Sequence, residues 1–248
     1  MSGHSKWATI KHKKGATDAK RAKVFAKLIR QVEVAAREGG ADPEMNPALR
    51  TMFQKARDQS VPLDTIEKAI KRGAGQLEGV AYESITYEGY ASGGVALLVD
   101  VLTDNRNRSG SDVRSVFTKR GGSVAEPGAV AWQFDRKGTM LVDGAVAEDD
   151  LMLAAIDAGA EDITREGDYW RVTTGPTDLH AVRTAVEEAG YKVEESDLTM
   201  VAQNLVTLDD KSAAKKVLDL VDALDDLDDV QAVHGNFDIT DEVLAELG

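Results

Sequence analysis

The chain has 248 residues, 42 % of them hydrophobic, which suffices for a buried core and for roughly two or three domains. It contains no cysteine, which excludes disulfides, thiolate nucleophiles and cysteine-based zinc sites. The sequence shows neither a signal peptide nor an apolar run long enough to cross a membrane, so we expect a cytoplasmic protein.

The formal net charge of −13 is distributed very unevenly along the chain. Residues 1–75 hold 16 Lys and Arg against 8 Asp and Glu, whereas residues 76–248 hold 14 against 35. Residues 1–30 alone carry nine cations and a single acid, Asp18. A cationic segment on an anionic protein is typical of a surface that binds a polyanion, and nucleic acid is the commonest polyanion in a cell.

A basic amphipathic helix is predicted over residues 19–37, after a segment, residues 1–16, that lacks helical periodicity. Asp18 is placed to cap this helix, and Gly39 and Gly40 are placed to end it. Its apolar face contains Phe25, Leu28, Ile29, Val32 and Ala36, and its opposite face contains Lys20, Lys23, Lys27, Arg30 and Arg37.

Two shorter helices follow and complete a predicted helical bundle. The first begins at Asn46-Pro47, a capping residue followed by a proline suited to the first turn, and is bounded by Pro62. The second begins near Asp64, with Glu67 as its capping-box partner, and is followed by a linker over residues 73–79. The positions expected to be buried are Leu49, Met52, Phe53, Ala56, Ile66, Ala69 and Ile70.

From residue 82 onward the pattern changes to one that favours strands. Residues 82–90 and 95–103 are predicted to form a hairpin, followed by a helix over 111–120 and a strand over 130–134. A βαββαβ order, typical of ferredoxin-like domains, comes next. Its strands are predicted at 139–142, 162–165, 169–174 and 192–200, and its helices at 149–158 and 178–189. A strand (205–208), a helix (213–224) and a strand (230–239) complete the chain.

These elements predict an α+β fold, with an N-terminal three-helix domain followed by two α/β domains, one of them inserted in the other. Residues 1–78 are expected to form the basic helical domain with its N-terminal arm. Residues 79–136 together with 205–248 are expected to form an α+β domain. Residues 137–204 would then be the inserted ferredoxin-like domain.

The first candidate site is the basic arm together with the first helix. Lysine and arginine release counterions when they pair with phosphates, and Trp7 and His12 offer flat rings that can stack on unpaired bases. Two alternatives stay open: the arm is a solvated tail without a binding role, and Trp7 packs against the bundle. The candidate residues are Lys6, Trp7, Lys11, His12, Lys13, Lys14, Lys20, Arg21, Lys23, Lys27 and Arg30.

The second candidate site is the segment Asp104–Arg108, which is predicted to be a loop between a buried strand and a helix. Arg106 and Arg108 offer planar forks suited to phosphate or guanine, and Asn105 and Asn107 lie beside them. One alternative is an ordinary turn in which Asn and Asp supply local hydrogen bonds. Another is that the arginines form internal ion pairs with the acidic part of the chain.

The sequence predicts no catalytic or metal site. The four histidines, His4, His12, His180 and His234, lack the spacing of metal ligands. The acidic run 222–229 lacks the glycine and the closing glutamate of an EF-hand loop and is better explained as an acidic helix end. Since no acid–base pair stands out either, we expect a protein without enzymatic activity, metal or other cofactor.

Four separated motifs occur in order along the chain: Gly3–Trp7 with Ile10–Lys14 and Asp18–Arg21, then Glu88–Tyr90 with Gly93–Ala96, then Thr103–Arg108, and finally Asp228–Gln231 with Asn236. Together they closely resemble the YebC/PmpR family over essentially the whole chain. The resemblance implies a cytoplasmic, three-domain α+β regulator that binds DNA. Related members act in translation, which implies ribosomal RNA as another possible target.

The sequence therefore predicts a non-catalytic, nucleic-acid-binding regulator of gene expression, of the DNA-binding transcriptional type. The main alternative is a ribosome-associated translation factor or translational activator that binds rRNA or mRNA through the same basic surface. A remote alternative is a nuclease, which would usually need clustered carboxylates or histidines. No membrane partner is expected, and the oligomeric state is left open.

Overall fold

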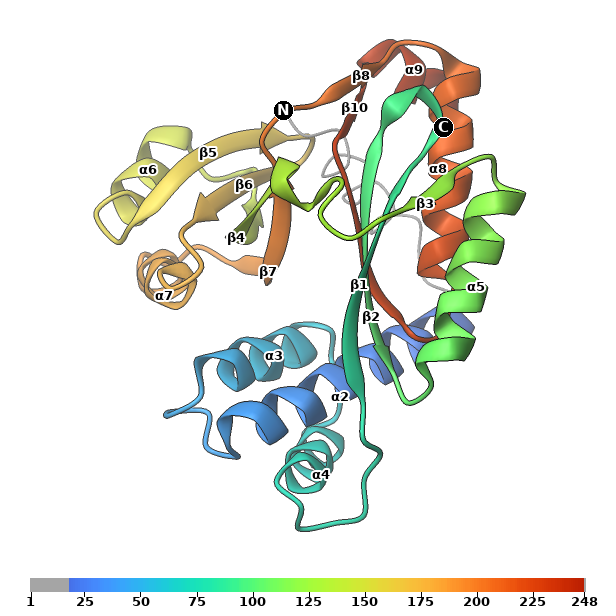
Figure 1. Cartoon of the computed structure of the whole chain (residues 1–248). Coiled ribbons are helices and arrows are strands. Elements are labelled where there is room, and N and C mark those ends of the chain that lie inside the picture. The colour runs from blue at the N-terminus through green and yellow to red at the C-terminus, as the bar shows by residue number, and fades with distance from the viewer. Residues whose placement is uncertain (1–17, 248) are drawn as a thin grey trace. The chain divides into compact units, whose positions relative to one another are not determined.

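The computed structural model describes the backbone of residues 18–247 and the side chains of residues 21–247. These residues divide into two compact units (Figure 1). Unit 1 contains residues 80–135 and 200–247, and unit 2 contains residues 18–79 and 136–199. Within the described residues, each unit is thus built from two separate stretches of chain. No helix within residues 18–247 is long and apolar enough to cross a membrane.

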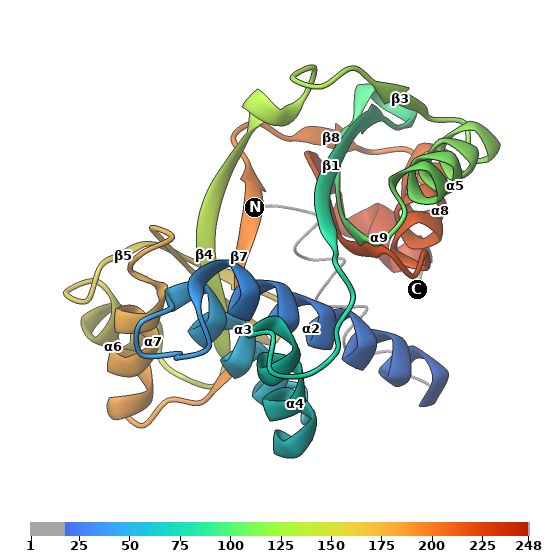
Figure 2. The same cartoon turned by 60° about the horizontal axis from the view of Figure 1, so that its bottom comes forward.

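Three helices form the first part of unit 2, as predicted: α2 (Asp18–Gly39), α3 (Pro47–Asp58) and α4 (Leu63–Gly73) (Figure 2). All of the apolar residues predicted to face the core lie in or around the common core of the three helices. Leu28, Val32, Ala36, Leu49, Ala56, Ile66 and Ala69 are buried there, and Phe25, Ile29, Met52, Phe53 and Ile70 are partly buried against them. The period of the apolar residues therefore determines how the three helices pack.

Capping residues explain where the bundle's helices begin. Asn46 caps α3 as predicted, because its Oδ1 accepts a hydrogen bond from the Leu49 N–H (3.0 Å). The predicted capping box of α4 is wrong: the helix begins at Leu63, after Pro62, and no side chain caps it. The carbonyl of Pro62 accepts the first hydrogen bonds of the helix, from the N–H groups of Thr65 and Ile66. The proline ring fixes the φ angle of Pro62, which limits the conformations of the chain where the helix begins.

The second part of unit 2 confirms the predicted ferredoxin-like order. It consists of β4 (Phe134–Asp143), α6 (Glu148–Ala155), β5 (Ala160–Glu166), β6 (Tyr169–Thr174), α7 (Leu179–Glu188) and β7 (Val193–Ala202). The strand order in the sheet is β5-β6-β4-β7, and β6 is antiparallel to both of its neighbours. Met140, Val142 and Val172 from the strands pack against Leu151 and Val182 from the helices.

A buried ionic cluster joins α3 to the ferredoxin-like part of unit 2. Arg183 on α7 is 7 % exposed, and its Nη1 and Nη2 donate to the two carboxylate oxygens of Asp58 (2.7 and 3.1 Å). The Nε of Arg183 also donates to Glu187 (2.9 Å), and Lys55 pairs with Asp197 (2.5 Å). A bidentate arginine–carboxylate contact fixes both distance and orientation, so it holds α3 and α7 in one arrangement.

Unit 1 is built on a four-stranded sheet with the order β3-β1-β2-β9. Its first stretch contains β1 (Glu83–Tyr90), β2 (Ala96–Thr103), α5 (Arg106–Lys119), β3 (Ser123–Ala125) and the 3₁₀ turn η2 (Ala131–Gln133). Its second stretch contains β8 (Val206–Leu208), α8 (Lys211–Asp225), β9 (Val230–Gly235), β10 (Phe237–Ile239) and α9 (Asp241–Leu247). Helices α5 and α8 lie side by side on one face of the sheet (Figure 1), and residues such as Val99, Phe117 and Leu220 form the core between them.

The predicted hairpin is confirmed, since β1 and β2 pair in antiparallel register from Glu83 with Thr103 to Tyr90 with Ala96. Two glycines make the turn between them possible. Gly93 and Gly94 have φ angles of +77° and +78°, which side chains other than glycine rarely adopt.

Several predicted elements of unit 1 differ from the structure. The strand expected over 130–134 is the turn η2, and the strand expected over 230–239 is broken at Asn236 into β9 and β10. Asn236 leaves the ladder because its side-chain Oδ1 accepts from the Ala96 N–H (2.7 Å) and its own N–H donates to the Ala96 carbonyl (3.2 Å). The short elements β3 and α9 are not predicted, because three and seven residues are too few to show a clear period.

Replacing Asp58 by alanine is expected to destabilise unit 2 by about 3 kcal/mol, since it leaves the buried Arg183 without its main counterion. The control is Asp64→Ala, which removes an exposed acid that pairs with the exposed Lys68 (3.4 Å) and should cost less than about 0.5 kcal/mol. Urea denaturation followed by circular dichroism measures both. Equal losses in the two variants would contradict the buried link between α3 and α7.

Candidate nucleic-acid interface

The helix α2 presents the part of the predicted basic surface that the structure describes. Arg21 and Lys23 are exposed, whereas Lys27 and Arg30 are only half-exposed, so the cationic face is narrower than its period suggests. The side chain of Lys20 lies outside the described residues. The same holds for the whole arm, which contains the candidates Lys6, Trp7, Lys11, His12, Lys13 and Lys14.

A buried acid on α2, Glu33, forms an ion pair with one cation of this face, Arg37. Glu33 is 4 % exposed, and its two carboxylate oxygens accept from Arg72 Nε on α4 (2.9 Å) and from Arg37 Nη2 (3.4 Å). Arg37 therefore balances an internal charge in addition to lying on the basic face. The burial of Glu33 is not evident from the sequence, because an acid one position after the apolar Val32 has the place of an ordinary exposed residue in the helical period.

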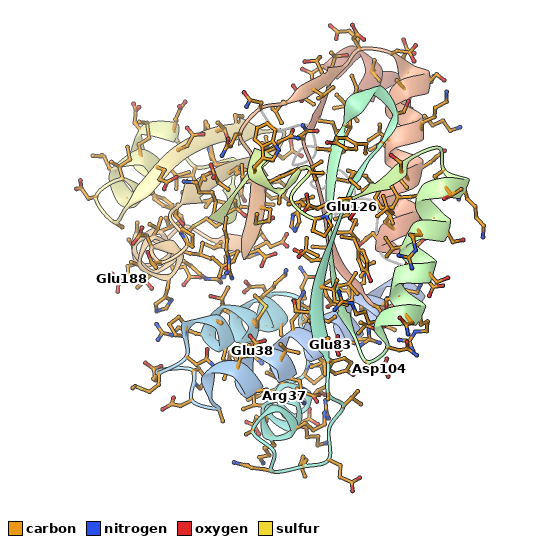
Figure 3. The ribbon with its side chains drawn as sticks, in the orientation of Figure 1. Arg37, Glu38, Glu83, Asp104, Glu126 and Glu188 are labelled. Carbon is orange, nitrogen blue, oxygen red and sulfur yellow. The ribbon has the colours of Figure 1, made fainter. Side chains whose placement is uncertain are left out.

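The second candidate segment is the start of a helix and not the predicted loop. Asn105 caps α5, because its Oδ1 accepts from the Arg108 N–H (3.1 Å), so Arg106 and Arg108 lie in the first helical turn. Asp104 precedes the cap in the short turn after β2 (Figure 3). The prediction places the helix start five residues late, at Ser111, because the first turn contains no large apolar residue to mark the period.

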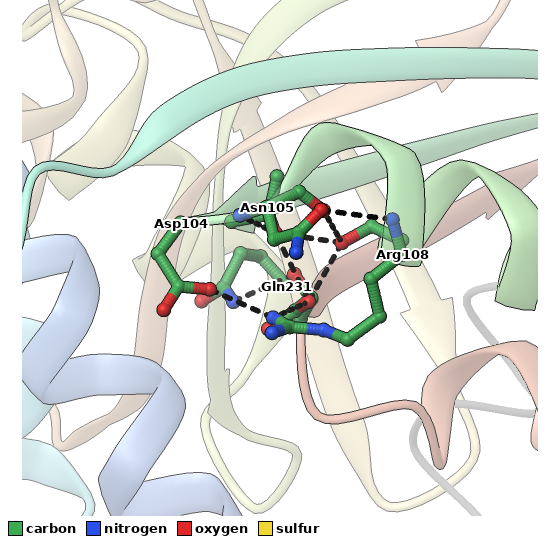
Figure 4. Close-up of polar contacts among 7 residues, drawn as sticks. Asp104, Asn105, Arg108 and Gln231 are labelled. Carbon is green, nitrogen blue, oxygen red and sulfur yellow. Dashed lines mark hydrogen bonds and ion pairs between the residues drawn. The ribbon is translucent and has the colours of Figure 1, made fainter.

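Asp229 organises this turn from the other end of unit 1. It directly precedes β9, and its Oδ2 accepts from Arg108 Nη2 (2.7 Å), from the Ser109 hydroxyl (2.6 Å) and from Thr103 Oγ1 (3.1 Å) (Figure 4). Arg108 Nη2 also donates to Asp104 Oδ1 (2.8 Å). One carboxylate thus links the end of β2, the start of α5 and the start of β9, which are far apart in sequence.

The environment of Asp229 stabilises its charged form. Partial burial favours the neutral acid, but the hydrogen bonds from Arg108, Ser109 and Thr103 outweigh this and hold the pKa of Asp229 below its usual value. Asp229 therefore carries a full negative charge at neutral pH, and the guanidinium of Arg108 is largely neutralised by it.

The two arginines of the turn consequently differ in what they offer a ligand. Arg108 forms ion pairs with Asp104 and Asp229, as the alternative of internal pairing anticipated. Arg106 is exposed and has no hydrogen-bond or ion-pair partner within residues 21–247. The first turn of α5 holds no acid of its own, and Asp104 and Asp229 pair with Arg108, so the guanidinium of Arg106 stays available to an anion.

Two features of this interface were not found from the sequence. The acidic run 222–229 predicts a helix end that includes Asp229, but α8 already ends at Asp225, and no local pattern pairs Asp229 with Arg108. The second feature is Trp132, whose side chain is 67 % exposed in the turn η2. The motif Asp228–Gln231 marks the region of Asp229 without indicating its partner, and no pattern in the sequence indicates that Trp132 is exposed.

Within residues 18–247 no group of three or more His, Cys, Asp or Glu side chains is arranged to hold a metal ion. In the sheet of unit 1, His234 Nε2 lies 3.0 Å from Asp100 Oδ2. Two residues are too few for a structural metal site.

Comparisons with known proteins agree over the whole chain. Residues 5–76 match the family model described as the TACO1/YebC protein N-terminal domain, and residues 82–237 match the TACO1/YebC second and third domain. A protein from Rubrobacter xylanophilus is 57 % identical and one from Halothermothrix orenii is 54 % identical. Each match covers 100 % of this chain and 99 % of the relative, and both relatives are called probable transcriptional regulatory proteins.

The solved structures include a closely similar protein. The crystal structure of a conserved hypothetical protein from Aquifex aeolicus superimposes with a TM-score of 0.84 at 45 % sequence identity. The match covers 92 % of this chain and 94 % of the Aquifex chain. The α+β architecture described above is therefore also that of an experimentally determined relative.

Replacing Asp229 by asparagine is expected to lower the free energy of unfolding by about 1–3 kcal/mol at pH 7, since a charged acceptor of several hydrogen bonds is removed. A carboxyl group with a depressed pKa contributes stability above its unfolded value and loses it as pH falls through the folded value. The difference between wild type and D229N should therefore shrink as pH falls below the usual value of 3.8. Urea denaturation between about pH 2.5 and 7 measures it. A difference that does not vary with pH would contradict the role of the charge.

Proposed function

Because the chain belongs to the TACO1/YebC family, we propose that it is a regulator of gene expression that binds nucleic acid and catalyses no reaction. The names of its relatives support a transcriptional role, and hence DNA as the working target. The sequence offers no candidate acid–base pair, which supports a binding function over catalysis. A regulator of this kind would act in the cytoplasm, where bacterial nucleic acid lies.

The observation that carries this proposal is the contrast between Arg106 and Arg108 in the first turn of α5. A cation at a helix N-terminus is unfavourable by roughly 0.3–1 kcal/mol, because the helix dipole favours anions there. Arg108 is compensated by two carboxylates, but Arg106 is exposed without a compensating acid among residues 21–247. An arginine kept in such a position is explained by a phosphate that binds to it and to the helix end together.

The proposed contacts divide into two groups. The arm and α2 supply mainly lysines, which contact phosphates without reading sequence. The start of α5 supplies the arginine fork and the neighbouring amides, which can also contact base edges. The proposed residues are Lys6, Trp7, Lys11, His12, Lys13, Lys14, Lys20, Arg21, Lys23, Lys27 and Arg30 in the first group, and Asn105, Arg106, Asn107 and Arg108 in the second, with Arg108 acting as a positioning residue.

The acidic remainder of the chain orients this binding. Residues 76–248 carry 35 acids against 14 cations, so phosphates are repelled from most of their surface. The basic residues 1–75 and the start of α5 then form the parts to which a polyanion can bind.

We also propose that the chain is organised as the three predicted domains, 1–78, 79–136 with 205–248, and 137–204.

A fivefold variant tests the arm. Replacing Lys11, Lys13, Lys14, Lys20 and Arg21 by alanine should weaken binding to DNA and RNA broadly. The slope of log affinity against log salt should become shallower by roughly 0.7–0.9 for each phosphate that the variant no longer binds. Fluorescence anisotropy with labelled oligonucleotides at several salt concentrations measures both quantities. Unchanged affinity and slope would exclude the arm as a contact site.

Single substitutions separate the two arginines of α5. Arg106→Ala should weaken binding and reduce the salt slope by roughly 0.7–0.9, the share of one phosphate. The melting temperature should not fall, because the removed cation is unfavourable at a helix N-terminus. Arg108→Ala should lower the melting temperature, because it leaves Asp229 without its ion pair. Lys216→Ala, an exposed lysine on α8, is the matched control and should change neither quantity. If R106A binds like the control, the start of α5 is not part of the interface.

The choice between DNA and the ribosome needs an experiment in cells. Crosslinking followed by sequencing of both bound DNA and bound RNA compares the two targets directly. Enrichment of promoter DNA supports the transcriptional proposal. Enrichment of ribosomal RNA, together with sedimentation of the protein with ribosomes at moderate salt, would replace it by the translational alternative.

A further inference from the structure

Two aromatic side chains of unit 1 are exposed next to each other, and we call them the aromatic pair: Tyr90 and Trp132. Trp132 is 67 % exposed and Tyr90 is 36 % exposed. Both polar atoms are bound to one carbonyl: the Trp132 Nε1–H donates to Ala129 O (3.1 Å), and the Tyr90 hydroxyl donates to the same oxygen (3.3 Å). This shared acceptor brings the two rings to one place, although they are 42 positions apart in sequence (132 − 90).

The loop that carries Trp132 is held rigidly by a buried carboxylate. Glu88 is 7 % exposed, and its oxygens accept from the backbone N–H groups of Gly128 (2.5 Å), Val130 (2.6 Å) and Ala131 (2.9 Å). Burial alone would raise the pKa of Glu88, but these three backbone hydrogen bonds hold it below its usual value. The carboxylate is therefore charged at neutral pH, and it fixes the loop on both sides of Ala129.

The residue after Trp132 is fixed as well. The N–H of Gln133 donates to the Val130 carbonyl (2.9 Å), and its side-chain oxygen accepts from Asn236 Nδ2 (2.9 Å). Trp132 therefore protrudes from a backbone that is anchored immediately before and after it. A rigid, exposed aromatic ring loses little conformational entropy when a ligand covers it.

The chemistry of the surface indicates which ligand it suits. The polar atoms of both rings are already bonded to Ala129, so the rings offer their flat faces and not their donors. Among the described residues of unit 1, the exposed large apolar side chains are these two and Val80. A protein-docking surface is usually a larger contiguous apolar patch, and the exposed Met152, Leu153 and Ile156 in and beside α6 of unit 2 are aliphatic instead of aromatic. A surface with flat aromatic faces and few aliphatic side chains suits stacking on another planar group.

The charges near the pair favour stacking over contact with phosphate. Glu126 is exposed in the same loop, and the exposed Asp135 follows Phe134 and accepts from Gln203 Nε2 (3.1 Å). These two acids, partly offset by the exposed Arg136 next to Asp135, disfavour a phosphate beside Trp132. A base that stacks there must therefore have its phosphates directed away, and its binding should depend little on salt.

We propose that Tyr90 and Trp132 form a stacking site for an unpaired nucleobase, which rests on the proposed nucleic-acid-binding function and specifies the form of its ligand. Paired bases in a duplex expose only their edges, so they cannot cover an aromatic face unless the helix opens. The aromatic pair thus selects single-stranded segments of DNA or RNA. The basic residues supply the phosphate contacts, and the pair supplies discrimination between single strand and duplex.

The test compares three labelled probes of one sequence by fluorescence anisotropy: an RNA of about 15 nucleotides, the same sequence as single-stranded DNA, and the DNA duplex. Trp132→Ala should weaken binding of both single strands by about 5- to 100-fold, the range typical of one stacked base. Its salt slope should stay that of the wild type, because no ion pair is removed. Trp132→Phe, which keeps a ring, should stay within about threefold of the wild type.

Two comparisons control this experiment. Leu153→Ala removes a similarly exposed apolar side chain from α6 and should leave all affinities unchanged. The duplex should bind wild type and W132A alike. A larger loss with RNA than with single-stranded DNA identifies RNA as the preferred source of the base, and the reverse identifies DNA.

The inference is wrong if W132A binds single strands as tightly as the wild type, which would assign the pair to another partner such as a protein. It is also wrong if the loss is equal for duplex and single strand, or if W132F is as weak as W132A. The proposed function is judged separately by the fivefold arm variant. If that variant loses affinity while W132A does not, the protein binds nucleic acid but does not stack a base here.

Discussion

The carboxylate of Asp229 is the interaction on which the candidate interface depends. It accepts hydrogen bonds from Arg108, Ser109 and Thr103, and so holds the end of β2, the first turn of α5 and the start of β9 at one point. This contact also determines the chemistry of the turn. Because Arg108 is neutralised by Asp229 and Asp104, the charge that remains available at the helix end is that of Arg106. A structural ion pair thereby determines which of two neighbouring arginines keeps its charge unpaired among the described residues.

Elsewhere the acids serve the fold in a similar way, by using cations that would otherwise lie on the surface. Glu33 binds Arg72 and Arg37 inside the bundle, and Asp58 binds Arg183 where α3 meets the ferredoxin-like part. Glu88 holds the loop around Ala129 in place by accepting hydrogen bonds from backbone N–H groups instead of from cationic side chains. In each case a buried carboxylate is stable because its charge is matched by directed donors.

Most of the fold follows from periodicity, and most of the site detail does not. The apolar positions of α2, α3 and α4 and the βαββαβ order could be predicted, because each depends on residues that are close in sequence. The break at Asn236 and the role of Asp229 could not, because each depends on a side chain whose partner is distant: Asn236 bonds to Ala96, and Asp229 bonds to Arg108. The basic arm can be recognised from its excess of lysine and arginine, and its contacts with nucleic acid stay a prediction.

The order of strands in unit 1 has a consequence for how the chain is made. Strand β2 is buried along nearly its whole length, and one of its two neighbours, β9, begins 127 residues after β2 ends (230 − 103). At about 5–20 residues per second, a ribosome needs roughly 6 to 25 s to deliver β9. During that interval an apolar strand has an open edge, which is a template for pairing with other nascent chains. The yield of soluble protein therefore depends on the C-terminal stretch arriving quickly, and a message truncated before β9 would release an aggregation-prone product.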